Sequence, residues 1–237
     1  MAGRVLITGF EPFGGARTNC TEMVVRTIEA ERLTDEITGS FDVRTAILPV
    51  TDSEGPAMLE RAIKEHAPDG VIALGEAETR TNVSVERVAL NLKDYRIPDN
   101  AGRTCRDEPI AVEGDDAYFA ALPVHTVCEA VQSEGVPCRL SRDAGLFLCN
   151  QIMYEVLKRV RVEGVLRYGG FLHLPLVREQ SGEKRAVFKS NDSDRGIKMS
   201  LDGSEGSVRG PIEPTVPTRE MARAVLAAAA VAHLMPA

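Results

Sequence analysis

The sequence predicts an α/β fold: a single three-layer α/β/α domain with a twisted, mostly parallel central sheet. Short apolar, β-branched segments alternate along the chain with amphipathic segments of helical period, which is the order of elements in a layered α/β domain. Segments such as Val71–Gly75 are apolar throughout, as strands buried on both faces of a parallel sheet are. No linker or internal repeat divides the chain, so we expect one domain over residues 1–237.

The first half of the chain reads as β-α-β-α-β. Asn19 and Glu22 resemble a capping box at the start of the first helix, and Ser53 is placed to cap the second. Ligands of such folds bind beyond the carboxyl ends of the strands, which here lie from Gly9 onward and from Gly75 onward. The expected strands are Arg4–Thr8, Val43–Val50 and Val71–Gly75, and the expected helices run from Asn19 to about Glu31 and from Ser53 to about His66.

The second half is less regular. Val83–Asn91 alternates as a half-buried strand, and the plain interpretation of Glu86 and Arg87, which interrupt it, is a solvated surface pair. The remaining expected elements are a helix at about 115–134 interrupted by Pro123 and carrying a surface His125, a strand at Pro137–Ser141, a helix after the Gly145 turn, a strand at Gly169–Leu176, and a last helix capped by Thr218. The polar segment at about 180–211 is expected to be a long loop or an inserted hairpin.

Composition limits the function. The 237 residues are 43% hydrophobic and 27% charged, as in ordinary soluble proteins, and the net charge of −7 argues against a nucleic-acid partner. No apolar run reaches the length of a membrane span, and residues 1–8 lack the apolar core of a signal peptide, so we expect no membrane partner. The five cysteines form no CxxC pair, so they suggest neither disulfides nor zinc, and a cytoplasmic location fits best.

Two residues are candidates for chemistry, each with a simpler alternative. Cys149 lies near the start of a helix, where unpaired N–H groups and the helix dipole stabilise a thiolate and lower the thiol pKa. A cysteine among apolar residues is, however, more often an inert core thiol. His173 lies near the carboxyl end of a strand, but a histidine between leucines is more often a hydrogen-bonded core residue. Periodicity alone leaves both alternatives open.

The glycine-rich loop Gly9–Gly15 also has two interpretations. A loop of this kind after a first strand could bind phosphate, but it has neither GxGxxG spacing nor the ending of a P-loop. Its two aromatic residues, Phe10 and Phe13, are better suited to line an apolar pocket.

Three groups of segments together resemble the pyroglutamyl peptidase I family, also called pyrrolidone-carboxylate peptidases. They occur in the family's order and span most of residues 4–176. The segments are Thr8–Gly15 with Asn19, Glu86–Asn91 with Ile97–Asn100, and Ser141–Tyr154 with Phe171–Pro175.

The resemblance implies a cysteine peptidase with Glu86, Cys149 and His173 as its catalytic triad. His173 would take the thiol proton, Glu86 would orient the imidazole, and the thiolate would attack the carbonyl of an N-terminal pyroglutamyl residue. Arg96 matches a family arginine associated with the oxyanion. No metal or organic cofactor is implied.

The resemblance also implies how the substrate binds. Phe10 and Phe13 would sandwich the lactam ring of an N-terminally pyroglutamylated peptide, and Asn19 would brace their loop. Family members are often tetramers, so a homo-oligomer is expected.

The sequence departs from the family pattern at Glu76, where an uncharged residue is usual, and at Glu78. This keeps two alternatives open. One is an amidohydrolase of the same fold whose pocket acids, Glu76 and Glu78, recognise a cationic substrate. The other is a non-catalytic member that binds a ligand or partner through residues 180–211.

Overall fold

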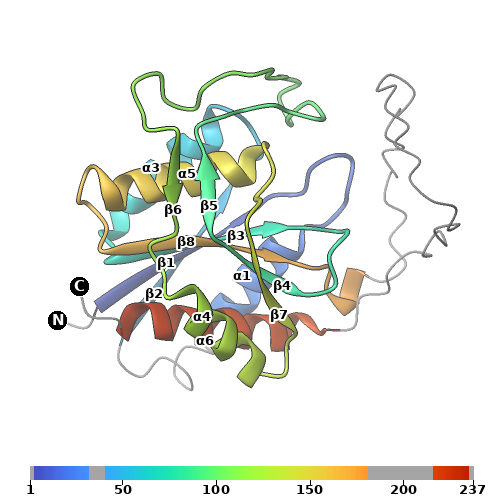
Figure 1. Ribbon diagram of the computed structural model, residues 1–237. Helices are drawn as coiled ribbons and strands as arrows, with labels where there is room; N and C mark the ends of the chain where they lie inside the picture. Colours follow the sequence, from blue (N-terminus) through green and yellow to red (C-terminus); the bar gives the residue numbers. More distant parts are fainter. Residues whose placement is uncertain (1–2, 32–40, 181–215, 235–237) are drawn as a thin grey trace, which may run out of the picture.

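A six-stranded sheet runs through the centre of the molecule (Figure 1). The computed structural model describes residues 3–31, 41–180 and 216–234. The strands β2, β1, β3 and β8 are mutually parallel, while β4 runs antiparallel to β8 and parallel to β7. This confirms the prediction of a mostly parallel sheet. In spatial order the strands are β2 (Phe41–Leu48), β1 (Gly3–Phe10), β3 (Gly70–Glu76), β8 (Tyr168–Leu174), β4 (Val83–Glu86) and β7 (Cys138–Ser141).

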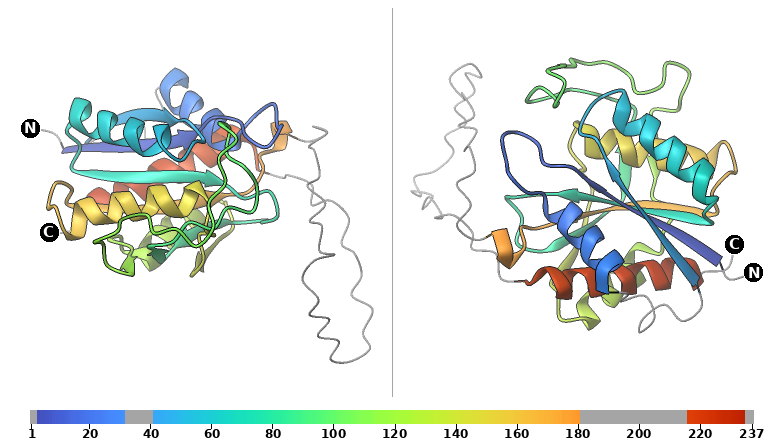
Figure 2. Two further views of the ribbon diagram at one scale, coloured as in Figure 1. Left: turned by 90° about the horizontal axis from the view of Figure 1, so that it is seen from above. Right: turned by 180° about the vertical axis from the view of Figure 1, so that it is seen from behind.

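Helices cover both faces of the sheet and complete the three layers (Figure 2). Helices α3 (Glu54–His66) and α5 (Leu148–Arg161) pack together on one face. Helices α1 (Cys20–Glu31), α4 (Val124–Ser133) and α6 (Thr218–Leu234) cover the other. Each face buries its own cluster of aliphatic and aromatic side chains, so the sheet is apolar on both sides, as the strand sequences predict.

A small hairpin of β5 (Val88–Leu90) and β6 (Ala117–Phe119) lies against α5 outside the main sheet. The expectation of one strand over 83–91 is therefore wrong, because the chain leaves the main sheet at Arg87 and pairs again in the hairpin. The expectation of helix from residue 115 is also wrong. Residues 117–119 pair with β5, and the helix begins only after Pro123, which has no N–H to donate inside a helix.

The predicted helix starts are close to those observed, but the capping differs. Asn19 caps α1 as expected, because its Oδ1 accepts the N–H of Thr21 at 2.9 Å. Glu22 pairs with Arg26 instead of completing a capping box. Ser53 is the N-cap residue of α3 but makes no side-chain cap bond.

Other expectations are tested only in part. The expected segment at about 180–211 lies, apart from Gln180 in the 3₁₀ helix η1 (Arg178–Gln180), outside the described residues. His125 is exposed, as predicted. No helix in the described ranges is long and apolar enough to cross a membrane.

The strand register brings functionally interesting residues to one edge of the sheet. The carboxyl ends of β1, β3 and β8 lie side by side, and Gly75 pairs directly with His173. Parallel strands of this kind gather ligands beyond their carboxyl ends.

Candidate active site

Cys149 is the second residue of α5, at the sheet edge just described. The helix follows a tight turn in which Gly145 has φ = +75°, a conformation that favours glycine. Asp143 Oδ1 accepts the Gly145 N–H at 2.8 Å and fixes this turn. Phe147 then precedes the helix in an extended conformation, which leaves Cys149 partly exposed at the helix start.

His173 and Glu86 form a buried pair on neighbouring strands. His173 Nδ1 lies 2.8 Å from Glu86 Oε1, and the two residues are 5% and 0% exposed. The antiparallel pairing of β4 with β8, which sets Ser84 opposite His173, brings them together. Glu86 is therefore not half of a solvated surface pair, although Arg87 is exposed.

Gly75 connects this pair to the cysteine. It lies beside His173 in the sheet, and a Cβ atom added to it would come within 2.9 Å of Cys149 Sγ and 2.7 Å of the Phe171 ring. Only a residue without a side chain allows α5 and the sheet to approach so closely. The structure thus gathers Cys149, His173 and Glu86 around the end of β3.

The electrostatic environment of Cys149 favours the protonated thiol over the thiolate. Although the residue is partly exposed, the protein atoms packed around it desolvate the thiol and raise the pKa of Cys149 to about 12, and the negative charge of Glu86 adds to the rise. The expectation that the helix start lowers this pKa is therefore wrong in direction, because desolvation outweighs the helix dipole.

The histidine–carboxylate pair is set up as a neutral base with an ionised partner. Burial lowers the pKa of His173, although the hydrogen bond that its Nδ1–H donates to Glu86 opposes this shift. Burial raises the pKa of Glu86, but the hydrogen bonds and charge of its partners, His173 foremost, outweigh this and leave the pKa below its usual value. A neutral imidazole beside a carboxylate is suited to accept a proton.

A narrow, largely apolar cavity opens beside Cys149. It contains four of the residues predicted to bind substrate, together with residues that the sequence analysis did not single out. Its lining consists of Phe10, Phe13, Asn19, Val50, Glu76, Phe147, Leu148 and Cys149. Phe147 is an addition whose ring lies 6.2 Å from that of Phe13.

Asn19 and Glu76, two polar residues of this cavity, fix the segments around it through hydrogen bonds. Asn19 Nδ2 donates to the carbonyl of Glu11 at 3.1 Å, which braces the loop after β1 as expected. Glu76 Oε2 accepts the N–H of Cys20 at 2.7 Å and the side-chain amide of Gln180 at 2.9 Å. The carboxylate of Glu76 is thus used to fix the start of α1.

Two arginines near the site have different placements. Arg96 is exposed, on a loop that approaches the nucleophile segment through the hydrogen bond from Asp94 N–H to Leu146 O at 3.1 Å. Arg80, which the sequence analysis does not single out, places its Nη1 2.5 Å from Glu86 Oε1. Only the tertiary contact between the β3–β4 turn and β4 reveals this role.

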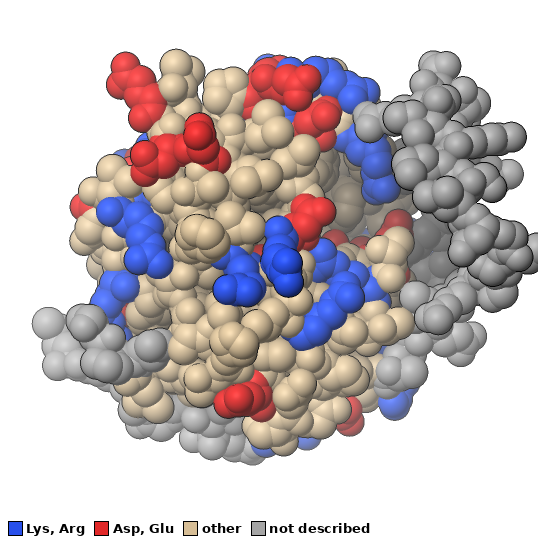
Figure 3. Space-filling view, viewed as in Figure 1, with Lys and Arg blue, Asp and Glu red and all other residues tan. Residues whose placement is uncertain are grey.

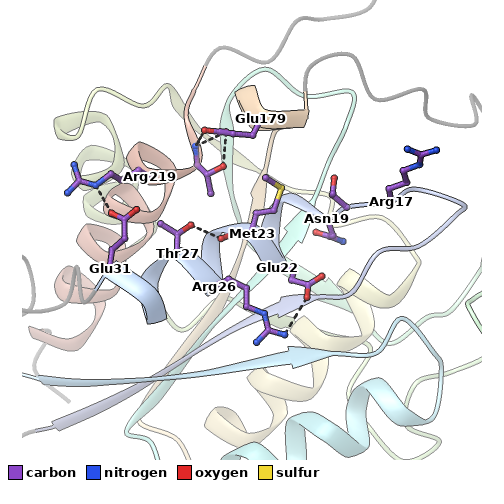
Figure 4. A pocket seen from close by; sticks show the side chains of 11 residues that line it. Arg17, Asn19, Glu22, Met23, Arg26, Thr27, Glu31, Glu179 and Arg219 are labelled. Carbon is purple, nitrogen blue, oxygen red and sulfur yellow. Dashed lines mark hydrogen bonds and ion pairs between the residues drawn. The ribbon is translucent and has the colours of Figure 1, made fainter.

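A second, wider cavity of about 580 Å³ lies between α1, η1 and the start of α6 (Figure 4). Its charged side chains largely pair with one another, as in Arg26–Glu22 and Arg219–Glu31. It shares Asn19 with the narrow cavity but not Cys149, so the candidate chemistry belongs to the narrow cavity.

Within the described ranges, no group of three or more His, Cys, Asp and Glu side chains is placed to hold a metal ion. The face in Figure 3 carries both basic and acidic side chains.

Comparison with known proteins gives one consistent family. Residues 3–201 match the family described as pyroglutamyl peptidase. The pyrrolidone-carboxylate peptidase of Thermococcus onnurineus is 44% identical over 181 residues, which are 76% of this chain and 88% of that protein. The corresponding protein of Bacillus licheniformis is 37% identical over 184 residues, covering 78% of this chain and 83% of its own length.

Solved structures agree with the sequence matches. Pyroglutamyl peptidase I of Bacillus amyloliquefaciens superposes with a TM-score of 0.78 at 30% identity, covering 98% of both chains. The pyrrolidone carboxyl peptidase of Thermococcus litoralis gives a TM-score of 0.79 at 32% identity, covering 98% of this chain and 93% of that one.

Proposed function

This chain belongs to the pyroglutamyl peptidase family, and from that premise we propose that it removes N-terminal pyroglutamyl residues from peptides by cysteine catalysis. The observation that carries the proposal is the position of Cys149. Cys149 lines an apolar cavity, and its thiol lies close to Gly75, which pairs in the sheet with His173 of the buried Glu86–His173 pair.

In the first step His173 accepts the thiol proton while Cys149 sulfur attacks the pyroglutamyl carbonyl. The pKa of the thiol is raised, so the attack needs His173 as the base that removes the proton. Glu86, ionised and hydrogen-bonded to Nδ1, orients the ring so that Nε2 accepts the proton, and it stabilises the imidazolium that forms.

The remaining steps use the same groups in reverse. His173 returns the proton to the departing amine, which leaves pyroglutamate bound to Cys149 as a thioester. Water then loses a proton to His173 and attacks the thioester, and the thiol is regenerated as pyroglutamate leaves. For the tetrahedral oxyanion we assign the backbone N–H of Cys149 at the helix start and the guanidinium of Arg96.

The cavity explains selection for a pyroglutamyl end. Phe10, Phe13 and Phe147 offer flat apolar surfaces to a small neutral lactam ring. A free N-terminal ammonium would have to lose its hydration without a free counter-charge, and this is costly.

The engagement of Glu76 argues against the cationic-substrate alternative. An acid that recognises a cation must present its carboxylate to the ligand, whereas Glu76 Oε2 is taken up by Cys20 N–H and Gln180. The assembled Glu86–His173 pair likewise argues against a purely binding role, which needs no buried acid–base pair.

We also propose a cytoplasmic homo-oligomer, a tetramer by family resemblance. All five cysteines are free thiols, as expected in a reducing compartment. Light scattering of the purified protein tests the oligomeric state, and a monomer at micromolar concentration would contradict it.

Matched substrates test the specificity. Pyroglutamyl-coumarin amide and prolyl-coumarin amide share a five-membered ring, but only the prolyl compound carries a charged amine. We expect release from the pyroglutamyl amide and at least about a hundredfold lower kcat/KM for the prolyl amide, as expected when a buried charge lacks a partner. Equal rates would contradict the proposed pocket, and faster release from the prolyl amide would favour a cationic substrate.

A further inference from the structure

Arg80 makes two contacts that join the site's acid to its nucleophile segment. It lies in the turn after β3, and its side chain is only 18% exposed. Nη1 lies 2.5 Å from Glu86 Oε1, and Nη2 donates to the carbonyl of Asp143 at 2.9 Å. The guanidinium thereby bridges the end of β4 and the turn that leads into α5.

Glu86 Oε1 is therefore shared between a guanidinium and an imidazole. His173 Nδ1 lies 2.8 Å from the oxygen that also receives Arg80 Nη1. The other oxygen, Oε2, is buried and has no hydrogen-bond partner in the described part of the structure. The contacts from His173 and Arg80 thus meet at one atom, where Arg80 supplies a full positive charge, and a hydrogen bond from Ser141 also favours the ionised form of Glu86.

We propose that Arg80 is a positioning residue of the reaction, which holds Glu86 ionised and aimed at His173 and offsets its charge so that His173 rests as a neutral base at neutral pH. This proposal rests on the function proposed above. It adds a fourth residue that acts through the Glu86–His173 pair without touching the substrate.

The charges around His173 determine the direction of the effect. Glu86 on β4 and Asp143 before α5 favour the imidazolium, and Arg80 opposes it. Glu76 lies at the end of β3 beside Leu174, and Cys149 faces the site from α5. Arg80 also favours the thiolate of Cys149, which Glu86 and Glu76 disfavour.

Loss of the charge at position 80 should move the pH dependence upward. Without the guanidinium the pKa of His173 rises, because the imidazolium no longer faces a neighbouring cation. The neutral form that accepts the thiol proton then predominates only at higher pH. The acid limb of kcat/KM should shift upward by about one pH unit, which is the usual size of one removed charge interaction.

Three variants separate charge from shape. Arg80→Met removes the charge and keeps the length, while Arg80→Lys keeps the charge and loses the fork that reaches both Glu86 and Asp143. Arg87→Met removes an exposed positive charge one residue from Glu86 and serves as the matched control. If Arg80→Met does not fold, Arg80→Gln, which still offers an amide donor to Asp143, takes its place.

The readouts are kcat/KM for pyroglutamyl-coumarin amide and the rate of iodoacetamide alkylation of Cys149, both followed from pH 5 to pH 9. At pH values on the acid side of the wild-type limb, we expect kcat/KM of Arg80→Met to be about tenfold lower than that of the wild type, as a shift of one pH unit requires. KM should be nearly unchanged. The pH at which alkylation of Cys149 becomes fast should also be higher in Arg80→Met than in the wild type. Arg80→Lys should keep the wild-type limb at a reduced kcat, and Arg87→Met should match the wild type.

Two outcomes would overturn the proposal. An Arg80→Met enzyme with reduced activity but an unshifted limb would show that Arg80 only supports the structure, and unchanged activity would show that it plays no part. If the wild type does not cleave the amide at all, the proposed function fails. The alkylation profiles of wild type and Arg80→Met still decide the role of Arg80 in that case.

Discussion

The carboxylate of Glu76 accepts the backbone N–H of Cys20 at 2.7 Å, so the residue that ends β3 also caps the first turn of α1. The same oxygen accepts the side-chain amide of Gln180 at 2.9 Å. A carboxylate is favoured at this place, because a helix N-terminus carries partial positive charge. Glu76, the acidic residue at which the sequence departs from the expected pattern, thus has a structural role beside the cavity.

Glu76→Gln should therefore preserve pyroglutamyl hydrolysis, because a glutamine carbonyl can still accept the Cys20 N–H. The loss of a negative charge near the thiol should speed alkylation of Cys149, since Glu76 contributes to its raised pKa. Kinetics of both reactions over pH check this. Loss of hydrolysis beyond about tenfold in a folded Glu76→Gln protein would mean that the carboxylate acts in the chemistry.

Gly75→Ala should lower both the activity and the stability of the enzyme. Its new Cβ would approach Cys149 Sγ to 2.9 Å and the Phe171 ring to 2.7 Å, so α5 or the sheet must shift. Overpacking of this kind typically costs about 1–3 kcal/mol in the free energy of unfolding. We expect a cooperative thermal transition at lower temperature, with kcat reduced at least about tenfold. Full activity would contradict the close approach of Cys149 to β3.

Phe13→Leu should weaken substrate binding without disturbing the thiol. The side chain lines the cavity, and loss of its aromatic surface should cost about 1–2 kcal/mol of contact with the lactam, or roughly a tenfold rise in KM. Phe119→Leu is the matched control, since Phe119 is 68% exposed on β6. Equal effects of the two substitutions on KM would exclude Phe13 from the binding site.

Asp52→Asn should destabilise the loop that carries Arg96. The Asp52 carboxylate accepts Tyr95 Oη at 2.7 Å, Lys93 Nζ at 3.0 Å and Arg103 Nε at 2.8 Å. We expect a loss of about 2–3 kcal/mol in the free energy of unfolding at pH 7, less than for a fully buried pair because Arg103 is half-exposed.

The pH dependence of this loss has a defined sign. Burial raises the pKa of Asp52, but hydrogen bonds from Tyr95 and Lys93 outweigh it, so the pKa lies below its usual value. Its stabilisation is present above the unfolded-state pKa of about 4 and is lost as the pH falls through the folded-state value. The unfolding free energies of wild type and Asp52→Asn in urea should therefore begin to converge as the pH falls below about 4. A constant difference down to pH 3 would contradict this, and Asp42→Asn, on the surface, should change little at any pH.

The sequence pattern predicts the sheet better than it predicts the hairpin. A continuous apolar run such as Val71–Gly75 predicts a strand buried on both faces, and this prediction does not require knowing which strands pair with it. The three residues of β6 form a strand only because β5 is available to pair with them, so residues 115–122 read as helix. Local pattern carries no information about such a partner.

In the site, too, the local sequence pattern predicts some features and misses those that depend on tertiary contacts. Resemblance places Glu86, whereas periodicity alone favours a solvated pair with Arg87, and the structure buries the first and exposes the second. The helix-start rule assigns Cys149 a lowered pKa, but desolvation by the packed sheet raises it. The contact of Arg80 with Glu86 depends on how a turn folds back over the sheet, which no local spacing encodes.

The central claim is that Cys149 is the nucleophile, and hydrolysis of pyroglutamyl-coumarin amide by two cysteine variants tests it most directly. Cys138→Ala, which removes another partly exposed thiol on β7, is the matched control and should retain wild-type kcat/KM. Cys149→Ala should fold normally and release no coumarin above background, because the remaining lining residues of the cavity include no other cysteine. Residual turnover by folded Cys149→Ala near the wild-type rate would show that another residue performs the attack and would contradict the mechanism.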